Sequence, residues 1–135
     1  MRFLSAAIVS ALAISACAPS AQVAPEVAAA SDAPDRCFRI DDIRNFSAAD
    51  TTTLYVRTVR DSVYQIDSTG GCWDMDTVLA LSITPMRGGF GTACVNDTVN
   101  IIVPGSTAGQ GRCTGIVRKA LTTEEVEALP SRVRP

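Results

Sequence analysis

The sequence predicts a small, mostly β domain with antiparallel strands and one short helix at its C-terminal end. Residues 53–59 alternate cleanly, with Leu54 and Val56 on one face, and a second run at 63–67 follows a short polar link. Two such runs joined in this way are typical of a β-hairpin. Residues 99–103 are rich in β-branched side chains and predict a further strand. We expect roughly five or six short strands, forming either a partly open barrel of the OB type or a small sandwich.

The residues before this hairpin predict a strand with a break in it. Phe38 and Ile40 alternate, but two aspartates interrupt the phase before Ile43. A shift of this kind predicts a bulge or a sharp bend. A short helical turn over 40–46 is the alternative, because Ile40 and Ile43 are also three positions apart. A turn at 48–51 then leads into the hairpin.

The second half of the chain predicts three further elements. Residues 77–84 are an apolar run bounded by proline, and periodicity does not decide between a buried strand and a short helix. Residues 114–120 alternate weakly and predict the last strand. The sequence TTEE at 122–125 is a capping box, which predicts a short helix ending near Leu129. We expect the tail at 130–135 to be frayed.

Composition and charge argue against several classes of function. The chain has 135 residues, with 14 acidic against 12 basic side chains, which is too balanced for the basic footprint of a nucleic-acid-binding protein. It contains no histidine. Histidine is the commonest general base, a member of the usual catalytic triads and a frequent zinc ligand. We therefore expect that the protein is not an enzyme and that it holds no cofactor.

The N-terminal residues 1–16 have the features of a bacterial export signal. Arg2 supplies a positive charge, and residues 3–16 carry none. This apolar run is short for a membrane span, which needs about 20 residues. The run ends Ile14-Ser15-Ala16-Cys17, which resembles a lipobox, where small residues precede the cysteine that receives a diacylglyceryl group. We predict that Cys17 is lipidated; the alternative is an ordinary secretory signal with an incidental cysteine.

Residues 17–35 are expected to form a flexible tether that begins with the lipidated cysteine. The segment 18–35 holds seven alanines, three prolines and no aromatic residue. A segment this poor in bulky apolar side chains does not support a core. Ala18 stands where lipoproteins kept at the inner membrane of enteric-type bacteria carry aspartate, which predicts the periplasmic side of the outer membrane. The single folded domain is then expected at 36–129.

The four remaining cysteines are Cys37, Cys72, Cys94 and Cys113. An even number of cysteines, export to an oxidising compartment and a core of about 95 residues together predict two disulfides. The spacings do not contain the closely paired ligands of a zinc site. Three pairings are possible. We favour the nested one, Cys37–Cys113 with Cys72–Cys94, and the sequential one, Cys37–Cys72 with Cys94–Cys113, is the alternative.

Other motifs give weaker signals. Asp74 and Asp76 could offer oxygens to calcium, but the EF-hand pattern is absent and a solvated turn is the simpler interpretation. The glycine-rich loop at 86–91 lacks the spacing and the lysine of a phosphate-binding loop. Asp41 and Asp42 are adjacent, and on a strand they would point to opposite faces. No catalytic, metal-binding or cofactor-binding residue is predicted.

The order of segments resembles that of an uncharacterised family of small proteobacterial lipoproteins, which is known as a domain of unknown function. The segments are RCFRIDDIRNF, TLYVRTVRDSVYQID, GGC, a later cysteine and LTTEEVEAL. The resemblance covers residues 36–129. It implies the lipid anchor and the disulfides, and it brings no catalytic residue, ligand or partner.

Together these features predict an envelope lipoprotein that acts as a non-enzymatic binding or interaction module on a tether. Its partners would be the membrane, through the lipid, and an envelope protein or ligand that the sequence does not identify. One alternative is an inhibitor of a periplasmic hydrolase, which would use a protruding loop at 86–91 or 104–111. Another is a periplasmic enzyme that uses carboxylates and arginines in a pocket.

Overall fold

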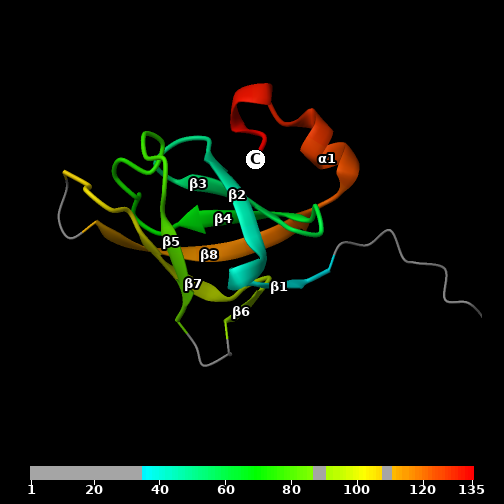
Figure 1. Ribbon diagram of the computed structural model, residues 1–135, viewed down its shortest axis with the longest axis horizontal. Coiled ribbons are helices and arrows are strands. Elements are labelled where there is room, and N and C mark those ends of the chain that lie inside the picture. Colours follow the sequence, from blue (N-terminus) through cyan, green and yellow to red (C-terminus); the bar gives the residue numbers. More distant parts are fainter. Residues whose placement is uncertain (1–34, 87–90, 108–110) are drawn as a thin grey trace, which may run out of the picture.

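The computed structural model describes residues 35–86, 91–107 and 111–135. The predicted signal peptide at 1–16, Cys17 and all of the tether except Asp35 lie outside the described residues. The described part is mostly β, as predicted. A six-stranded antiparallel sheet curls into a half-barrel, and a two-stranded sheet and one short α-helix accompany it (Figure 1).

The strand order of the large sheet is β2-β3-β4-β8-β7-β5, and β1 pairs with β6 in the small sheet. The strands are β1 (Cys37–Arg39), β2 (Ile43–Ala48), β3 (Thr53–Thr58), β4 (Val63–Ser68), β5 (Ser82–Pro85), β6 (Thr92–Cys94), β7 (Thr98–Ile102) and β8 (Arg112–Leu121). The helices are the 3₁₀ turn η1 (Ile40–Asp42), α1 (Thr123–Ala128) and the 3₁₀ turn η2 (Ser131–Val133). Within the described ranges, no helix is long and apolar enough to cross a membrane.

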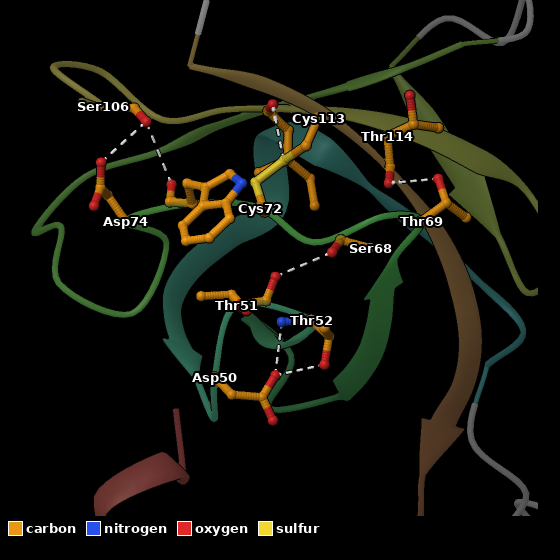
Figure 2. Close-up of a disulfide and its surroundings, with 12 residues drawn as sticks. Asp50, Thr51, Thr52, Ser68, Thr69, Cys72, Asp74, Ser106, Cys113 and Thr114 are labelled. Atoms are coloured by element: carbon orange, nitrogen blue, oxygen red, sulfur yellow. Dashed lines mark hydrogen bonds between the residues drawn. A yellow bond between two sulfur atoms is a disulfide. The ribbon is translucent and has the colours of Figure 1, made fainter. Parts of the chain in front are cut away.

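The hairpin predicted at 53–67 is confirmed as β3 and β4. Its inward face carries Leu54 and Val56, which are fully buried, and Val56 lies opposite Tyr64 in the register. The alternation of apolar and polar side chains therefore reports burial of one face of the sheet. The turn before the hairpin is closed by Asp50, whose Oδ1 accepts hydrogen bonds from the Thr52 amide at 2.6 Å and from the Thr52 hydroxyl at 2.6 Å (Figure 2).

The break predicted before the hairpin contains both of the expected features. Ile40–Asp42 forms a 3₁₀ turn, and the pairing of β2 with β3 shifts register between Ile43 and Asn45. The Ile40 amide donates to the Gly91 carbonyl at 2.7 Å. β1 belongs to the small sheet and β2 to the large one, so the chain passes from one sheet to the other at this turn.

The apolar run at 77–84 is neither a continuous strand nor a helix. A turn in which the Thr77 amide donates to the Asp74 carbonyl at 3.1 Å occupies its start, and β5 begins only at Ser82. Leu79 is 99% exposed, so apolar character here does not report burial. Pro85 lies in β5, which is tolerated because β5 is an edge strand.

The C-terminal helix is confirmed, including its capping box. The Glu125 amide donates to the Thr122 hydroxyl, and the Thr122 amide donates to the Glu125 carboxylate at 3.0 Å. The prediction that residues 130–135 are frayed is wrong. Val133 is 6% exposed, and the Arg57 Nε donates to the Pro135 carbonyl at 2.7 Å. One buried valine and a hydrogen bond to a strand are enough to dock this short tail.

The pairing of β4 with β8 joins the two halves of the large sheet. β8 is the longest strand and lies between β4 and β7. At Gly115 the strands approach so closely that an added Cβ would lie 2.8 Å from the Ile66 Cγ2. Ile66 and Val117 are fully buried at this junction. Glycine is needed there because of the close approach of the Ile66 side chain.

The predicted disulfide pairing is wrong. The structure joins Cys37 to Cys94 and Cys72 to Cys113, an interleaved arrangement that is neither the nested nor the sequential scheme. The reason is strand order. β1 pairs with β6, which places Cys37 directly opposite Cys94, and Cys72 follows β4, whose neighbour β8 carries Cys113 (Figure 2). The spacing of the cysteines along the sequence does not show which strands are neighbours in the sheets.

The two disulfides should contribute unequally to stability. For closed loops spanning 57 and 41 positions, the chain-entropy model gives about 4 kcal/mol each. Cys72, however, is 2% exposed and belongs to the core cluster, so its replacement also leaves a cavity. We expect the double substitution C72A/C113A to lower the free energy of unfolding more than C37A/C94A does. Urea unfolding of the full chain measures this, and the opposite ranking would contradict it.

Candidate functional site

A groove of about 360 Å³, lined by apolar and polar side chains, lies between the two edges of the curled sheet. Its residues come from η1, β2, the segment before β5, and β5 itself, and we call it the seam groove. Its apolar members are Ile40, Ile43, Phe46, Leu79, Leu81 and Ile83, and its polar members are Arg44, Asn45 and Ser82. β2 and β5 are the terminal strands of the sheet and do not pair with each other (Figure 1). The groove lies along this open side of the half-barrel.

The apolar side chains of the seam groove grade from buried to exposed. Ile83 is 5% exposed, Phe46 and Leu81 are half-buried against the core, and Leu79 is 99% exposed. A single exposed leucine is common on protein surfaces. Here the exposed leucine lines the same groove as the half-buried Phe46 and Leu81.

The groove continues along the free edge of β2. A second depression of about 310 Å³ shares Asn45, Phe46 and Leu79 with the seam groove and extends to Ala48. An edge strand presents unpaired backbone N–H and C=O groups, which can pair with another extended chain. One end of this edge is covered by η2, where the Ser47 hydroxyl donates to the Arg132 carbonyl at 3.3 Å.

The charge in the seam groove is balanced locally. Its one cationic side chain, Arg44, forms an ion pair with Asp61. Asp61 is also approached by the Arg57 Nη1 at 3.6 Å. The groove therefore offers apolar side chains and backbone hydrogen-bonding groups as its main means of recognition, and it has no strong preference for one sign of charge.

A second, polar pocket lies between β1 and the turn that joins β3 to β4. It brings together Asp35, Arg39, Asp42 and Arg60, and its volume is about 120 Å³. The Tyr64 hydroxyl at its base donates to the Asp35 carbonyl at 2.9 Å, and burial raises the pKa of this phenol. Pockets that hold small-molecule ligands usually measure about 300–1,000 Å³, so this pocket admits only a very small molecule.

Asp74, considered above as a calcium ligand, is engaged by a neighbouring loop. Its Oδ2 accepts a hydrogen bond from the Ser106 hydroxyl at 3.1 Å (Figure 2). The same oxygen accepts hydrogen bonds from the Thr107 amide at 2.7 Å and from the Thr107 hydroxyl at 2.9 Å. The Thr107 amide, more than any other group, lowers the pKa of Asp74. Among the described residues, no three side chains are grouped so that they could hold a metal ion. The structure thus assigns Asp74 the role of fastening two loops beside the Cys72–Cys113 disulfide.

The sequence pattern did not single out the seam groove. Its residues come from segments that were predicted as a strand with a break and as a buried apolar run. The one available signal was the apolar run before Pro85, which is longer than an edge strand of four residues needs. The loops proposed for an inhibitor, 86–91 and 104–111, lie partly outside the described residues.

Comparison with known proteins identifies a family but no individual similar protein. No curated protein and no solved structure matches the chain significantly. A family model described as a family of unknown function, DUF6491, matches residues 1–118, so the match begins earlier than the resemblance at 36–129 and stops before α1. Because this match covers most of the chain, the protein belongs to the family of unknown function DUF6491.

Proposed function

We propose that the protein is a non-enzymatic binding module of the bacterial envelope, anchored by a lipid on Cys17 to the periplasmic side of the outer membrane. The observation that carries the binding role is the seam groove, an open depression with several apolar side chains between the two edge strands of the sheet. The bound partner would be an extended segment of another envelope protein. The tether at 17–35 would let the domain reach that partner while it stays attached to the membrane.

The geometry of the groove supports an extended partner. Such a segment can pair its backbone with the free edge of β2 and place alternate side chains in a neighbouring apolar groove. Ile43 and Phe46 lie along this edge, and Leu79 stands on the other side of the groove. The volumes of about 360 and 310 Å³ lie within the range of binding pockets in proteins.

The anchor is supported by the sequence of the N-terminal segment. The apolar run ends in Ile14-Ser15-Ala16-Cys17, and a cysteine at this boundary is what lipid transfer requires. The family match includes residues 1–16, so this segment belongs to the matched region. A single acyl chain binds a membrane only marginally, whereas the several chains of a bacterial lipoprotein anchor it stably.

An enzyme based on carboxylates and arginines could use the polar pocket beside β1 or a second pocket, of about 330 Å³, that is lined by Arg57, Asp61, Glu127 and Arg134. The pocket beside β1 has a volume of about 120 Å³, a third of the volume of the seam groove. In the second pocket Asp61 is paired with Arg44 and Arg57, and the Arg134 Nη2 donates to the Glu127 and Leu129 carbonyls. Arg39 is also paired outward, with its Nη2 3.5 Å from the Asp41 carboxylate. These observations favour the binding module as the proposed function.

Changing Cys17 to alanine should abolish lipid attachment. We expect unprocessed precursor to accumulate, because the signal peptidase for lipoproteins acts after the thiol has been modified. Metabolic labelling with palmitate followed by immunoprecipitation measures this, and C37A provides a matched control that removes a different cysteine. Labelled mature protein in the C17A variant would contradict the proposed anchor.

A photo-crosslinking residue at position 79 should capture a partner in the native envelope. Leu79 is 99% exposed in the groove, so replacing it should change stability by no more than about 0.5 kcal/mol. The matched control is position 59, because Val59 is 57% exposed but does not line the groove. We expect discrete adducts at position 79 and none of the same mass at position 59. Identical adducts at both positions would contradict the groove as the binding surface.

A further inference from the structure

The two disulfides lie in different environments. Cys72 is 2% exposed and is packed within the core cluster, and its partner Cys113 lies on the central strand β8. Cys37 is exposed and its partner Cys94 is partly exposed, and both lie in the small sheet at the edge of the domain. Exchange between a thiol and a disulfide requires that the attacking thiolate reach a sulfur atom. A reductant in solution can therefore approach Cys37–Cys94 without disturbing the core.

The strand pair that carries the exposed disulfide is short. β1 and β6 form a ladder of three residue pairs in which Cys37 lies directly opposite Cys94. A two-stranded sheet of this size is at best marginally stable by itself. Beyond the ladder, the Val95 amide donates to the Arg36 carbonyl at 2.8 Å, and the Ile40 amide donates to the Gly91 carbonyl at 2.7 Å. The covalent bridge is thus a main constraint that keeps β1 against β6.

β1 contacts the large sheet through Phe38, a member of the core cluster, and through its backbone. Phe38 is 6% exposed, and its ring centroid lies 4.3 Å from that of Tyr64. The Tyr64 hydroxyl lies 3.2 Å from the Cys37 carbonyl, to which it can donate. Release of β1 would break these contacts, while the β-ladders of the large sheet, which join β2 through β8 and β5, would stay intact. Opening at this place is a local event of the kind that hydrogen exchange detects.

We propose that Cys37–Cys94 is a site of thiol–disulfide exchange with a dithiol reductant and that its reduction releases β1 from β6, while Cys72–Cys113 stays oxidised. One thiolate of the dithiol attacks the Sγ of one cysteine, and the other cysteine leaves as a thiolate that takes up a proton from water. The second thiol of the reductant then loses its proton and attacks the mixed disulfide. Both protein cysteines end as thiols, and the dithiol, which has supplied two electrons, ends as a disulfide.

This exchange would act on both surfaces described above. β1 lines the polar pocket through Cys37 and Arg39, and it runs directly into η1, whose Ile40 forms part of the seam groove. Release of β1 therefore removes one wall of the polar pocket and loosens one end of the seam groove. The exchange itself depends only on the exposure of the disulfide, and it would occur whether or not the groove binds a partner.

Graded reduction of the full-length protein tests the proposal. The protein is incubated with increasing dithiothreitol, quenched with N-ethylmaleimide and mapped by peptide mass spectrometry. We expect Cys37 and Cys94 to be alkylated at a dithiothreitol concentration about tenfold below that needed for Cys72 and Cys113, because reduction of the buried bridge requires a larger opening. Alkylation of all four cysteines at one concentration, or of Cys72 and Cys113 first, would overturn the proposal.

A second measurement separates local opening from unfolding. After reduction at the lower concentration, the amides of Ile40 and Val95 should exchange with solvent faster, while those of β3 and β4 should keep their protection. The variant C37S/C94S should show the same fast exchange without reductant, whereas C72S/C113S should not raise exchange selectively at Ile40 and Val95. Loss of protection throughout the large sheet after reduction of Cys37–Cys94, or unchanged exchange at Ile40 and Val95, would each overturn the release of β1.

Discussion

The pairing of β8 with β4 is the interaction on which the rest of the domain depends. β2, β3 and β4 form a meander on one side, β7 and β5 follow on the other, and β8 is the strand that joins them. At the junction Ile66 and Val117 are fully buried, and Gly115 leaves room for the Ile66 side chain. This is a contact between segments about fifty residues apart in sequence, so it forms only after considerable chain entropy has been lost. The Cys72–Cys113 bridge offsets part of that entropy, because it joins the same two regions.

The open seam follows from the same architecture. A curled sheet closes into a barrel only when its two edge strands are long enough and aligned well enough to pair with each other. Here one edge is β5, which has four residues and ends in Pro85, a residue that lacks a backbone N–H to donate. The opposite edge, β2, is shielded at one end by η2 and carries the charged residue Arg44. Such features protect an edge strand from uncontrolled pairing. The stretch between them is left open and is flanked by Phe46 and Leu79.

Local features of the fold could be predicted from the sequence, and features set by strand order could not. Alternation identified the hairpin with Leu54 and Val56 on its buried face, and the capping box at Thr122 identified α1, because in both cases the deciding contacts lie within a few residues. The pairing of the cysteines depends on β1 lying beside β6 and on β4 lying beside β8, which no local pattern encodes. The burial suggested by the apolar run at 77–84 was wrong at Leu79 for a related reason. Its apolar neighbours suggested burial, but a turn before a short edge strand leaves it outside the sheet.

The interleaved disulfides divide the domain into a part with permanent cross-links and a part that can open. One bridge reinforces a strand pair that is already stabilised by burial, and its sulfur atoms have little contact with solvent at Cys72. The other joins two strands of three residues each at the point where the chain enters the domain. A disulfide matters most for holding two segments together where few non-covalent contacts join them. If both bridges had joined strands of the large sheet, reduction of either would have acted on the core. Because Cys37–Cys94 lies in the small sheet, a chemical change at that bridge acts on the N-terminal wall of both surface pockets and on the core side chain Phe38, while the β4–β8 ladder stays paired.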